Sequence, residues 1–109
     1  MYTVIKRLEI SGAHKLTLDY DSKCKNLHGH NWIIYITCQS DELNASGMVI
    51  DFKTISDLIK TKLDHVYIND VIPVNPTAEH IAKWICDVVP NCVKVEVQES
   101  EGNVAIYEK

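Results

Sequence analysis

Two histidines separated by one residue, His28 and His30, are the residues of this sequence best suited to metal chemistry. Spacing by two directs both imidazoles to one face of an extended strand, where their ring nitrogens can bind one ion. His14 precedes a short stretch rich in Lys and Asp that can return the chain to the same place. Three histidines would form an open zinc site with a position left for a further ligand. Histidines also lie on solvated strands or in hydrogen-bonded cores, so the spacing alone leaves both interpretations open.

Three further side chains have the chemistry for proton transfer. Cys24 lies just before the histidine pair, between Lys23 and Lys25, whose positive charges stabilise a thiolate. A lone cysteine is otherwise most often a small buried apolar residue. Asp64 and His65 follow the last apolar residue of a predicted helix. They are either a helix end or, if the carboxylate orients the imidazole, a general acid/base pair.

One carboxylate interrupts an apolar strand face near the end of the chain. Val93, Val95 and Val97 alternate with polar residues and predict a strand with its odd positions toward the core. The same parity directs Glu99 inward, where an unpaired carboxylate is costly to bury. Either the strand ends or bulges before Glu99, or the carboxylate meets hydrogen-bond donors in a pocket. A ligand with adjacent N–H groups would suit the second alternative.

Length and charge limit the size of the domain and the kinds of partner that it can bind. The 109 residues predict a single domain, 1–109, with a modest core, so a subunit of this size often gains from association. A net charge of −4 argues against general nucleic-acid binding. Residues 1–30 nevertheless hold five basic and three acidic side chains. These are either ordinary surface lysines or groups that attract an anionic substrate to the histidines.

Cysteine usage and hydropathy indicate where such a protein works. The four cysteines form no CxxC pair, which predicts free thiols in a reducing compartment. The first ten residues alternate like a strand rather than a signal segment, and no apolar run approaches the roughly 20 residues that cross a bilayer. We therefore expect a cytoplasmic protein that does not bind a membrane.

The periodicity predicts two strands, two helices and two more strands. Tyr2, Val4, Leu8 and Ile10 share one strand face, and residues 32–36 are a β-branched and aromatic run. Asp51 can cap a helix and Thr77 a second one, which Pro90 ends. The apolar faces of these helices are Phe52, Ile55, Ile59 and Leu63, and Ile81, Ile85 and Val88. Residues from 92 onward predict a hairpin with its turn at Gly102 and Asn103, so the order is ββααββ, an α+β class with an antiparallel sheet.

Taken together, these motifs resemble the superfamily of 6-pyruvoyl-tetrahydropterin and 6-carboxy-tetrahydropterin synthases over nearly the whole chain. The Cys-x-x-x-His-Gly-His element together with Leu-Asp-His is its most specific part. The matching motifs are Ala13-His14, Cys24-x-x-x-His28-Gly29-His30, Gly47-Met48-Val49-Ile50-Asp51-Phe52, Leu63-Asp64-His65-x-x-Ile68-Asn69, Asn75-Pro76-Thr77-Ala78-Glu79 and Glu99-Ser100.

The resemblance assigns roles to these residues. Cys24 becomes the catalytic base, Asp64 with His65 a second proton-transferring pair, and Glu99 a catalytic residue that anchors the pterin. The full sets implied are zinc ligands His14, His28 and His30, catalytic residues Cys24, Asp64, His65 and Glu99, and substrate-binding residues Thr77, Glu99 and Ser100. The implied fold is the tunnelling fold (T-fold), with a four-stranded antiparallel sheet and two helices per subunit, trimers that close into a barrel, and hexamers of two trimers.

The implied reaction is zinc-dependent conversion of 7,8-dihydroneopterin triphosphate to 6-carboxy-5,6,7,8-tetrahydropterin, with release of acetaldehyde and triphosphate, on the route to queuosine and other 7-deazaguanines. Two alternatives stay open. The first is the same enzyme class with a different product, above all 6-pyruvoyl-tetrahydropterin. The second is a catalytically silent pterin- or metal-binding module, against which the presence of Cys24, Asp64, His65 and Glu99 together argues.

Overall fold

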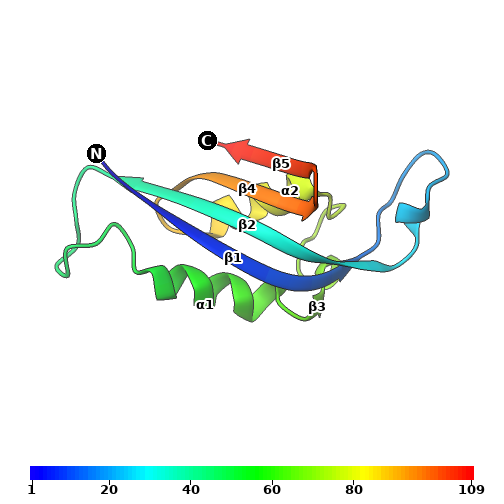
Figure 1. The fold of residues 1–109 in the computed structure, drawn as a ribbon, viewed down its shortest axis with the longest axis horizontal. Helices are drawn as coiled ribbons and strands as arrows, with labels where there is room; N and C mark the ends of the chain where they lie inside the picture. The colour runs from blue at the N-terminus through cyan, green and yellow to red at the C-terminus, as the bar shows by residue number, and fades with distance from the viewer.

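The fold is one long sheet with two helices packed against the same face. The computed structural model describes residues 1–109 as an elongated molecule of 51 × 25 × 23 Å (Figure 1). Its elements are β1 (Tyr2–His14), η1 (Lys23–Lys25), β2 (His28–Ser40), α1 (Phe52–Leu63), β3 (Val66–Tyr67), η2 (Ile68–Asp70), α2 (Ala78–Val88), β4 (Cys92–Ser100) and β5 (Asn103–Glu108).

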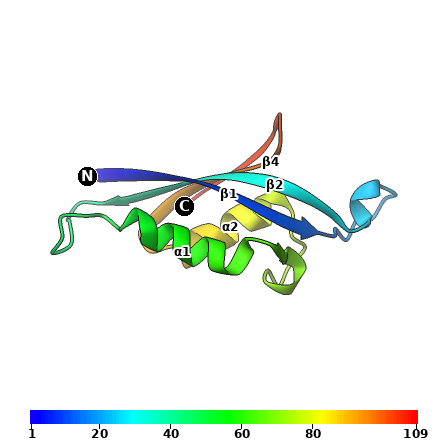
Figure 2. The ribbon, with the colours of Figure 1, turned by 60° about the horizontal axis from the view of Figure 1, so that its bottom comes forward.

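The strand order in the sheet is β3-β1-β2-β4-β5, and α1 and α2 lie together on one side of it (Figure 2). Helix α1 packs beneath β1, whereas α2 packs beneath β4 and β5. The predicted α+β class and the order of the four main strands and two helices are therefore confirmed. The fifth strand, β3, runs parallel to β1 and was not predicted, because two residues are too short to show a period.

Both helices begin where the sequence predicts. The Asp51 carboxylate accepts a hydrogen bond of 2.8 Å from the backbone N–H of Lys53, and the Thr77 hydroxyl accepts one of 3.2 Å from that of His80. Helix α1 buries Ile55, Ile59 and Leu63. Helix α2 buries Ile81, Ala82, Ile85 and Cys86. Two residues of the predicted faces differ, since Phe52 in the first turn of α1 is exposed and Val88 at the end of α2 is only half-buried.

The core lies between the sheet and these helices and corrects one strand assignment. Val95 and Val97 are buried as predicted, but Val93 is not. A β-bulge places Cys92 opposite Cys38, so Val93 is an extra residue and the inward parity changes beyond it. Tyr2 was also predicted on the inward face, yet it is exposed because the start of β1 extends past α1 (Figure 2).

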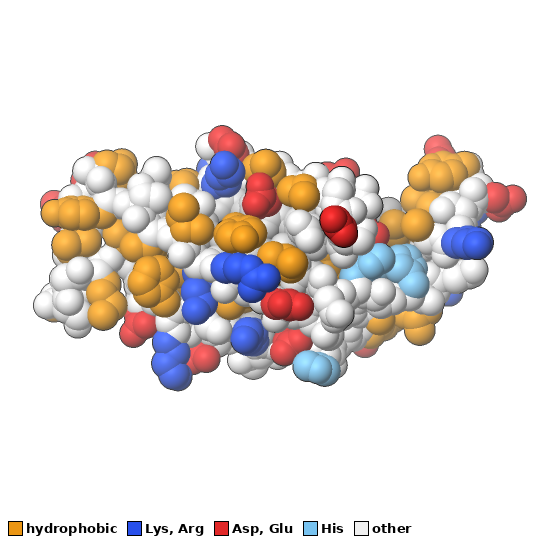
Figure 3. Space-filling view, in the orientation of Figure 1, with side chains coloured by type: hydrophobic (Ala, Val, Ile, Leu, Met, Phe, Trp, Pro, Cys, Tyr) orange, Lys and Arg blue, Asp and Glu red, His pale blue; other side chains and the backbone are white.

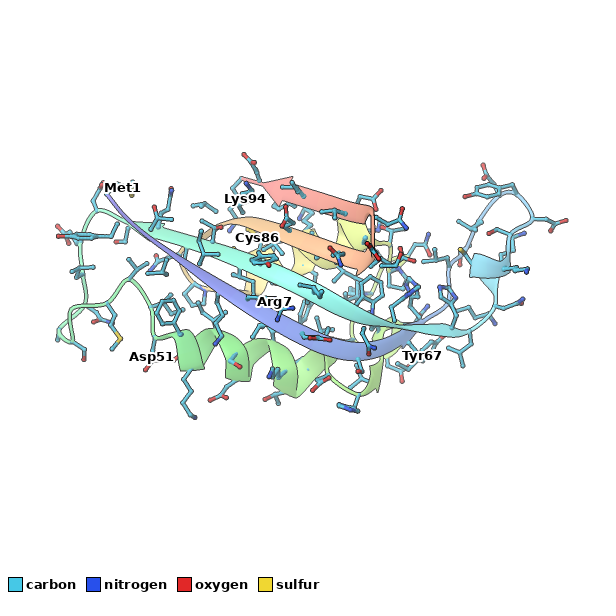
Figure 4. The ribbon with its side chains drawn as sticks, in the orientation of Figure 1. Met1, Arg7, Asp51, Tyr67, Cys86 and Lys94 are labelled. Carbon is cyan, nitrogen blue, oxygen red and sulfur yellow. The ribbon has the colours of Figure 1, made fainter.

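The other face of the sheet has no helix over it and faces the viewer in Figure 3. Apolar and charged side chains mix on this uncovered face, and its apolar members include Ile5, Tyr35, Val104 and Ile106, which are 39% to 58% exposed. Arg7 lies near its centre (Figure 4). No helix is long and apolar enough to cross a membrane. All four cysteines are free thiols, and Cys38, Cys86 and Cys92 are buried.

Strands β1 and β2 form the longest pairing of the sheet and position the histidines. They pair antiparallel along their full length, from Tyr2 opposite Ser40 to His14 opposite His28. The loop of residues 15–27, here the histidine loop because it joins His14 to His28, connects β1 to β2 and projects beyond the end of the sheet (Figure 1). The two predicted strands thus form one hairpin, which brings residues 14 and 28 side by side.

Candidate functional site

Three imidazoles meet at the end of the β1–β2 hairpin. His14 and His28 are directly opposed, and His30 lies two residues further along β2 on the same face. The ring centroid of His14 lies 4.5 Å from that of His28 and 5.3 Å from that of His30. The hairpin register therefore converts the predicted spacing of three histidines into one group of donors.

The Nε2 atoms of all three rings are buried and have no hydrogen-bond partner. Unpartnered buried polar atoms are costly, and in native proteins such atoms call for an explanation such as a bound ion. Together with a carboxylate oxygen of Glu99, the ligand atoms of His14, His28 and His30 lie within 4.8 Å of one another. Three imidazole nitrogens aimed at one point are a donor set that fits zinc.

The opposite ring nitrogens fix how these imidazoles point. Nδ1 of His14 lies 2.8 Å from the backbone carbonyl of Pro76, and Nδ1 of His28 lies 2.7 Å from that of Asn26. Since a carbonyl only accepts, each Nδ1 carries the proton and each Nε2 presents its lone pair. Burial lowers the pKa of His14, which favours the neutral form that binds metals.

Trp32 supports two of the rings from within the core. Its ring lies edge-on to His14 and His30, with centroids 4.9 and 5.1 Å away, and its Nε1 donates to the Gly12 carbonyl at 3.1 Å. Gly12 is closely packed, because a Cβ there would lie 2.9 Å from Cδ1 of the buried Ile68, whose side chain would have to shift. The histidines thus lie on paired strands whose inner face packs against the core.

Glu99 reaches this group from β4, and the structure has the bulge that the sequence left as one alternative but no hydrogen bond to the carboxylate. The β4–β5 register shifts between Gln98 and Ser100, so Glu99 lies at a bulge, and its side chain nevertheless turns inward and is 28% exposed. One carboxylate oxygen lies 2.8 Å from Nε2 of His30, without the alignment of a hydrogen bond. A bulge commonly re-aims a side chain beside an active site.

A second acidic residue lies near Glu99. Glu79, at the start of α2, and Glu99 both line a pocket of about 380 Å³ whose other walls come mainly from the β4–β5 turn and β5. Glu79 was not predicted as a site residue. Of the two carboxylates, only Glu99 also reaches the histidines, so it lies between them and an open space that a ligand could fill.

Asp64 and His65 form a preassembled pair at the junction of α1 and β3. The Asp64 carboxylate accepts 2.9 Å from the backbone N–H of Ser11 and lies 3.1 Å from Nδ1 of His65. The backbone N–H of His65 donates to the Ser11 carbonyl at 2.6 Å, and its φ of 56° is in the left-handed region. The Ser11 hydrogen bond, followed by His65, lowers the pKa of Asp64.

This pair is not part of the ligand group. The His65 side chain is 80% exposed, and His65 is not among the four clustered residues that could hold a metal ion. His30 and His65 do line the same open hollow of about 470 Å³, along the edge of β1 and β3. In Figure 3 several histidine side chains gather beside the histidine loop and another lies apart at the lower rim.

Cys24 lies in η1, on the histidine loop. It is half-buried, and its backbone N–H donates 3.2 Å to the hydroxyl of Ser22, the residue that caps η1. It is not among the four clustered ligand residues. Because the other three cysteines are buried, Cys24 is the only cysteine with substantial access to solvent.

The two predicted hydroxyl contacts have structural partners. Thr77 caps α2, and the Ser100 hydroxyl accepts 2.9 Å from Nδ2 of Asn103 across the β4–β5 turn. Their roles toward a substrate stay predictions. The carbonyls of Asn26 and Pro76 were not predicted, since a backbone oxygen leaves no signal in residue types.

The comparisons with known proteins agree with the motifs. A family model described as "6-pyruvoyl tetrahydropterin synthase" matches residues 3–109. The chain is 31% identical to the 6-carboxy-5,6,7,8-tetrahydropterin synthase of Bacillus subtilis, over 94% of this chain and 82% of that protein. It is 35% identical to the protein of the same name from Synechocystis, over 98% and 93%.

Solved structures share the fold. The 6-pyruvoyl tetrahydropterin synthase of Caenorhabditis elegans has a TM-score of 0.78 at 23% identity, covering 99% of this chain and 95% of that one. An uncharacterized protein from Wolinella succinogenes has a TM-score of 0.77 at 18% identity, covering 99% and 98%. At these identities the likeness concerns the arrangement of the strands and helices.

Proposed function

Because the chain belongs to the 6-pyruvoyl tetrahydropterin synthase family, we propose that it converts 7,8-dihydroneopterin triphosphate to 6-carboxy-5,6,7,8-tetrahydropterin, releasing acetaldehyde and triphosphate. The names of the Bacillus subtilis and Synechocystis relatives support this product. The observation that carries the proposal is the group of three unpartnered Nε2 atoms with Glu99 beside them. We place the reaction in the cytoplasm, on the route to queuosine.

Zinc is the proposed metal, held by Nε2 of His14, His28 and His30. When bound, zinc supplies a positive charge that lowers the pKa of a substrate hydroxyl. The carbonyls of Pro76 and Asn26 support this assignment, because they hold two of the rings in the tautomer that leaves Nε2 free to bind zinc. We expect about one zinc per chain in native protein, measured by metal analysis.

Cys24 is the proposed base that removes the proton from the substrate side chain. Its solvent access and its place on the loop between two ligand strands support this role. Glu99 is the proposed anchor for the pterin ring, since a carboxylate accepts two parallel hydrogen bonds from adjacent N–H groups. We place Thr77 and Ser100 beside the ring, in line with their positions at the start of α2 and the end of β4.

Asp64 and His65 are the proposed second proton-transferring pair, and we propose that they serve the histidines of another subunit. The exposed His65 and the apolar residues of the uncovered sheet face support association into trimers or hexamers. Mixing Cys24→Ala with His65→Ala subunits tests this arrangement. Random trimers would regain about a quarter of wild-type activity, because one site in four receives both intact residues. Failure of the mixture to regain activity, with exchange of subunits verified, would place both residues of a site in one chain.

The reaction is tested by incubating purified protein with 7,8-dihydroneopterin triphosphate and identifying the products by mass. We expect 6-carboxy-5,6,7,8-tetrahydropterin together with acetaldehyde. Formation of 6-pyruvoyl-tetrahydropterin without acetaldehyde would favour the second candidate, which the family description and the Caenorhabditis elegans structure suggest. Binding without turnover would instead identify a silent pterin-binding module, and Cys24→Ala with full turnover would require a different base.

A further inference from the structure

Two asparagine side chains fasten the first residues of the histidine loop. Oδ1 of Asn69 accepts 3.0 Å from the backbone N–H of Lys15, and its Nδ2 donates 2.8 Å to the carbonyl of the same residue. Asn75 repeats the pattern at Thr17, with distances of 2.9 and 3.0 Å. Each side-chain amide thus pairs with both backbone polar groups of one residue, as a neighbouring strand would.

The residue between these two positions connects the fastened segment to Cys24. The backbone N–H of Leu16 donates 3.1 Å to the carbonyl of Cys24. The backbone polar groups of successive residues in an extended segment point to opposite sides. Those of Lys15 and Thr17 therefore face the two asparagines, and the N–H of Leu16 faces Cys24. The backbone of Cys24 is therefore linked through Leu16 to a segment that Asn69 and Asn75 hold at both ends.

Within the rest of the histidine loop, this cysteine is held only by contacts with its near neighbours in sequence, such as the hydrogen bond from its backbone N–H to the Ser22 hydroxyl. Residues 15–27 lie beyond the end of the sheet (Figure 1), and η1 is a single short turn with no buried residue. A loop of this length without packing of its own samples many conformations. The asparagine contacts come from η2 and the segment before α2, which are distant in sequence and anchored to the core by the buried Ile68 and Ile72.

We propose that Asn69 and Asn75 are positioning residues that hold Cys24 in place for the reaction. They act on the backbone of the histidine loop and do not touch the substrate. The inference rests on the proposed function in that Cys24 is the base. It also concerns only this chain's geometry, so the placement of the thiol can be measured without substrate.

Alkylation of the native, metal-loaded protein by iodoacetamide reports on Cys24, because the other three thiols are buried. Asn69→Leu removes both bonds to Lys15. Each such bond contributes about a factor of five to a local opening equilibrium, so we expect the alkylation rate to rise by up to about 25-fold. Asn69→Asp keeps an acceptor and loses the donor, and it should give an intermediate rate.

Asn44→Leu is the matched control. The Asn44 side chain also bonds two backbone N–H groups, those of Ser46 and Met48, but its turn lies at the opposite end of the molecule from the histidine loop (Figure 1). A merely structural loss would affect both variants alike. An Asn69→Leu rate within twofold of that of Asn44→Leu would overturn the inference, whereas a rise of fivefold or more over that control supports it.

Turnover separates this inference from the proposed function. We expect Asn69→Leu to lower kcat at least tenfold with KM and zinc content unchanged, since only the base is displaced. Asn75→Leu is compared with Asn69→Leu only after its zinc content has been measured. Asn75 adjoins Pro76, whose carbonyl holds His14, so this substitution can also change metal binding. A faster alkylation with unchanged kcat would overturn the role in the reaction, and full activity of Cys24→Ala would instead remove the base from the proposed function.

Discussion

Glu99→Gln is the substitution that most sharply tests how the site is organised. Glu99 is the only carboxylate among the four clustered residues, and one of its oxygens lies 2.8 Å from Nε2 of His30. It can therefore be either the anchor of the pterin ring or a fourth ligand of the metal. Glutamine keeps the size and shape of the side chain but removes its charge and one of its two acceptors.

The magnitude follows from the bonds that the carboxylate would make to the ring. An ionised acceptor contributes about 1.5–3 kcal/mol per hydrogen bond, and glutamine replaces one of two such bonds by an N–H facing an N–H. The side chain is 28% exposed, so solvent screens part of this interaction. We therefore take a loss of about 2 kcal/mol, which lowers kcat/KM by about 30-fold.

The assay combines steady-state kinetics with metal analysis of the same samples. We expect Glu99→Gln to lose kcat/KM while keeping about one zinc per chain, since three histidines suffice to hold the ion. Glu101→Gln is the control, because Glu101 is exposed in the β4–β5 turn two residues away. Loss of zinc from the Glu99 variant, or a kcat/KM equal to that of the control, would refute the role of anchor.

Three further outcomes follow from the geometry. His28→Ala should lose most of its zinc and its turnover in the same preparations, and normal turnover of a metal-free sample would contradict the mechanism. Gly12→Ala should lower the free energy of unfolding by about 1–2 kcal/mol, because the added Cβ would lie 2.9 Å from Cδ1 of the buried Ile68. An unchanged denaturation midpoint would mean that the Ile68 side chain moves aside without cost. The folded-state pKa of Asp64 lies below its usual 3.8, so the native protein should be more stable than Asp64→Asn at pH 7 and should lose this difference in the free energy of unfolding as the pH falls below about 4. Urea titrations across this pH range measure the difference, and a constant value would exclude the linkage.

The sequence predicted those parts of the site that depend on neighbours along one strand or across one hairpin. His28 and His30 share a face because strand residues alternate, and His14 joins them because β1 and β2 pair along their full length. The inward direction of Glu99 followed from the same alternation, and the helix caps from local chemistry. Val93 was assigned wrongly, because a bulge changes parity and its only trace is the pairing with a distant strand.

The contacts that the sequence could not predict are those that join backbone atoms to distant side chains. Nδ1 of His14 bonds a carbonyl 62 residues away, and Asn69 bonds Lys15 across 54 residues. Such partners exist only after η2 and the segment before α2 have packed against the end of the sheet. The same packing that selects the histidine tautomer therefore also fastens the loop that carries Cys24. If the proposed metal site and the proposed base both depend on this junction, they should respond together when the junction is weakened. They should respond separately when only one of the three histidines or only one asparagine is replaced.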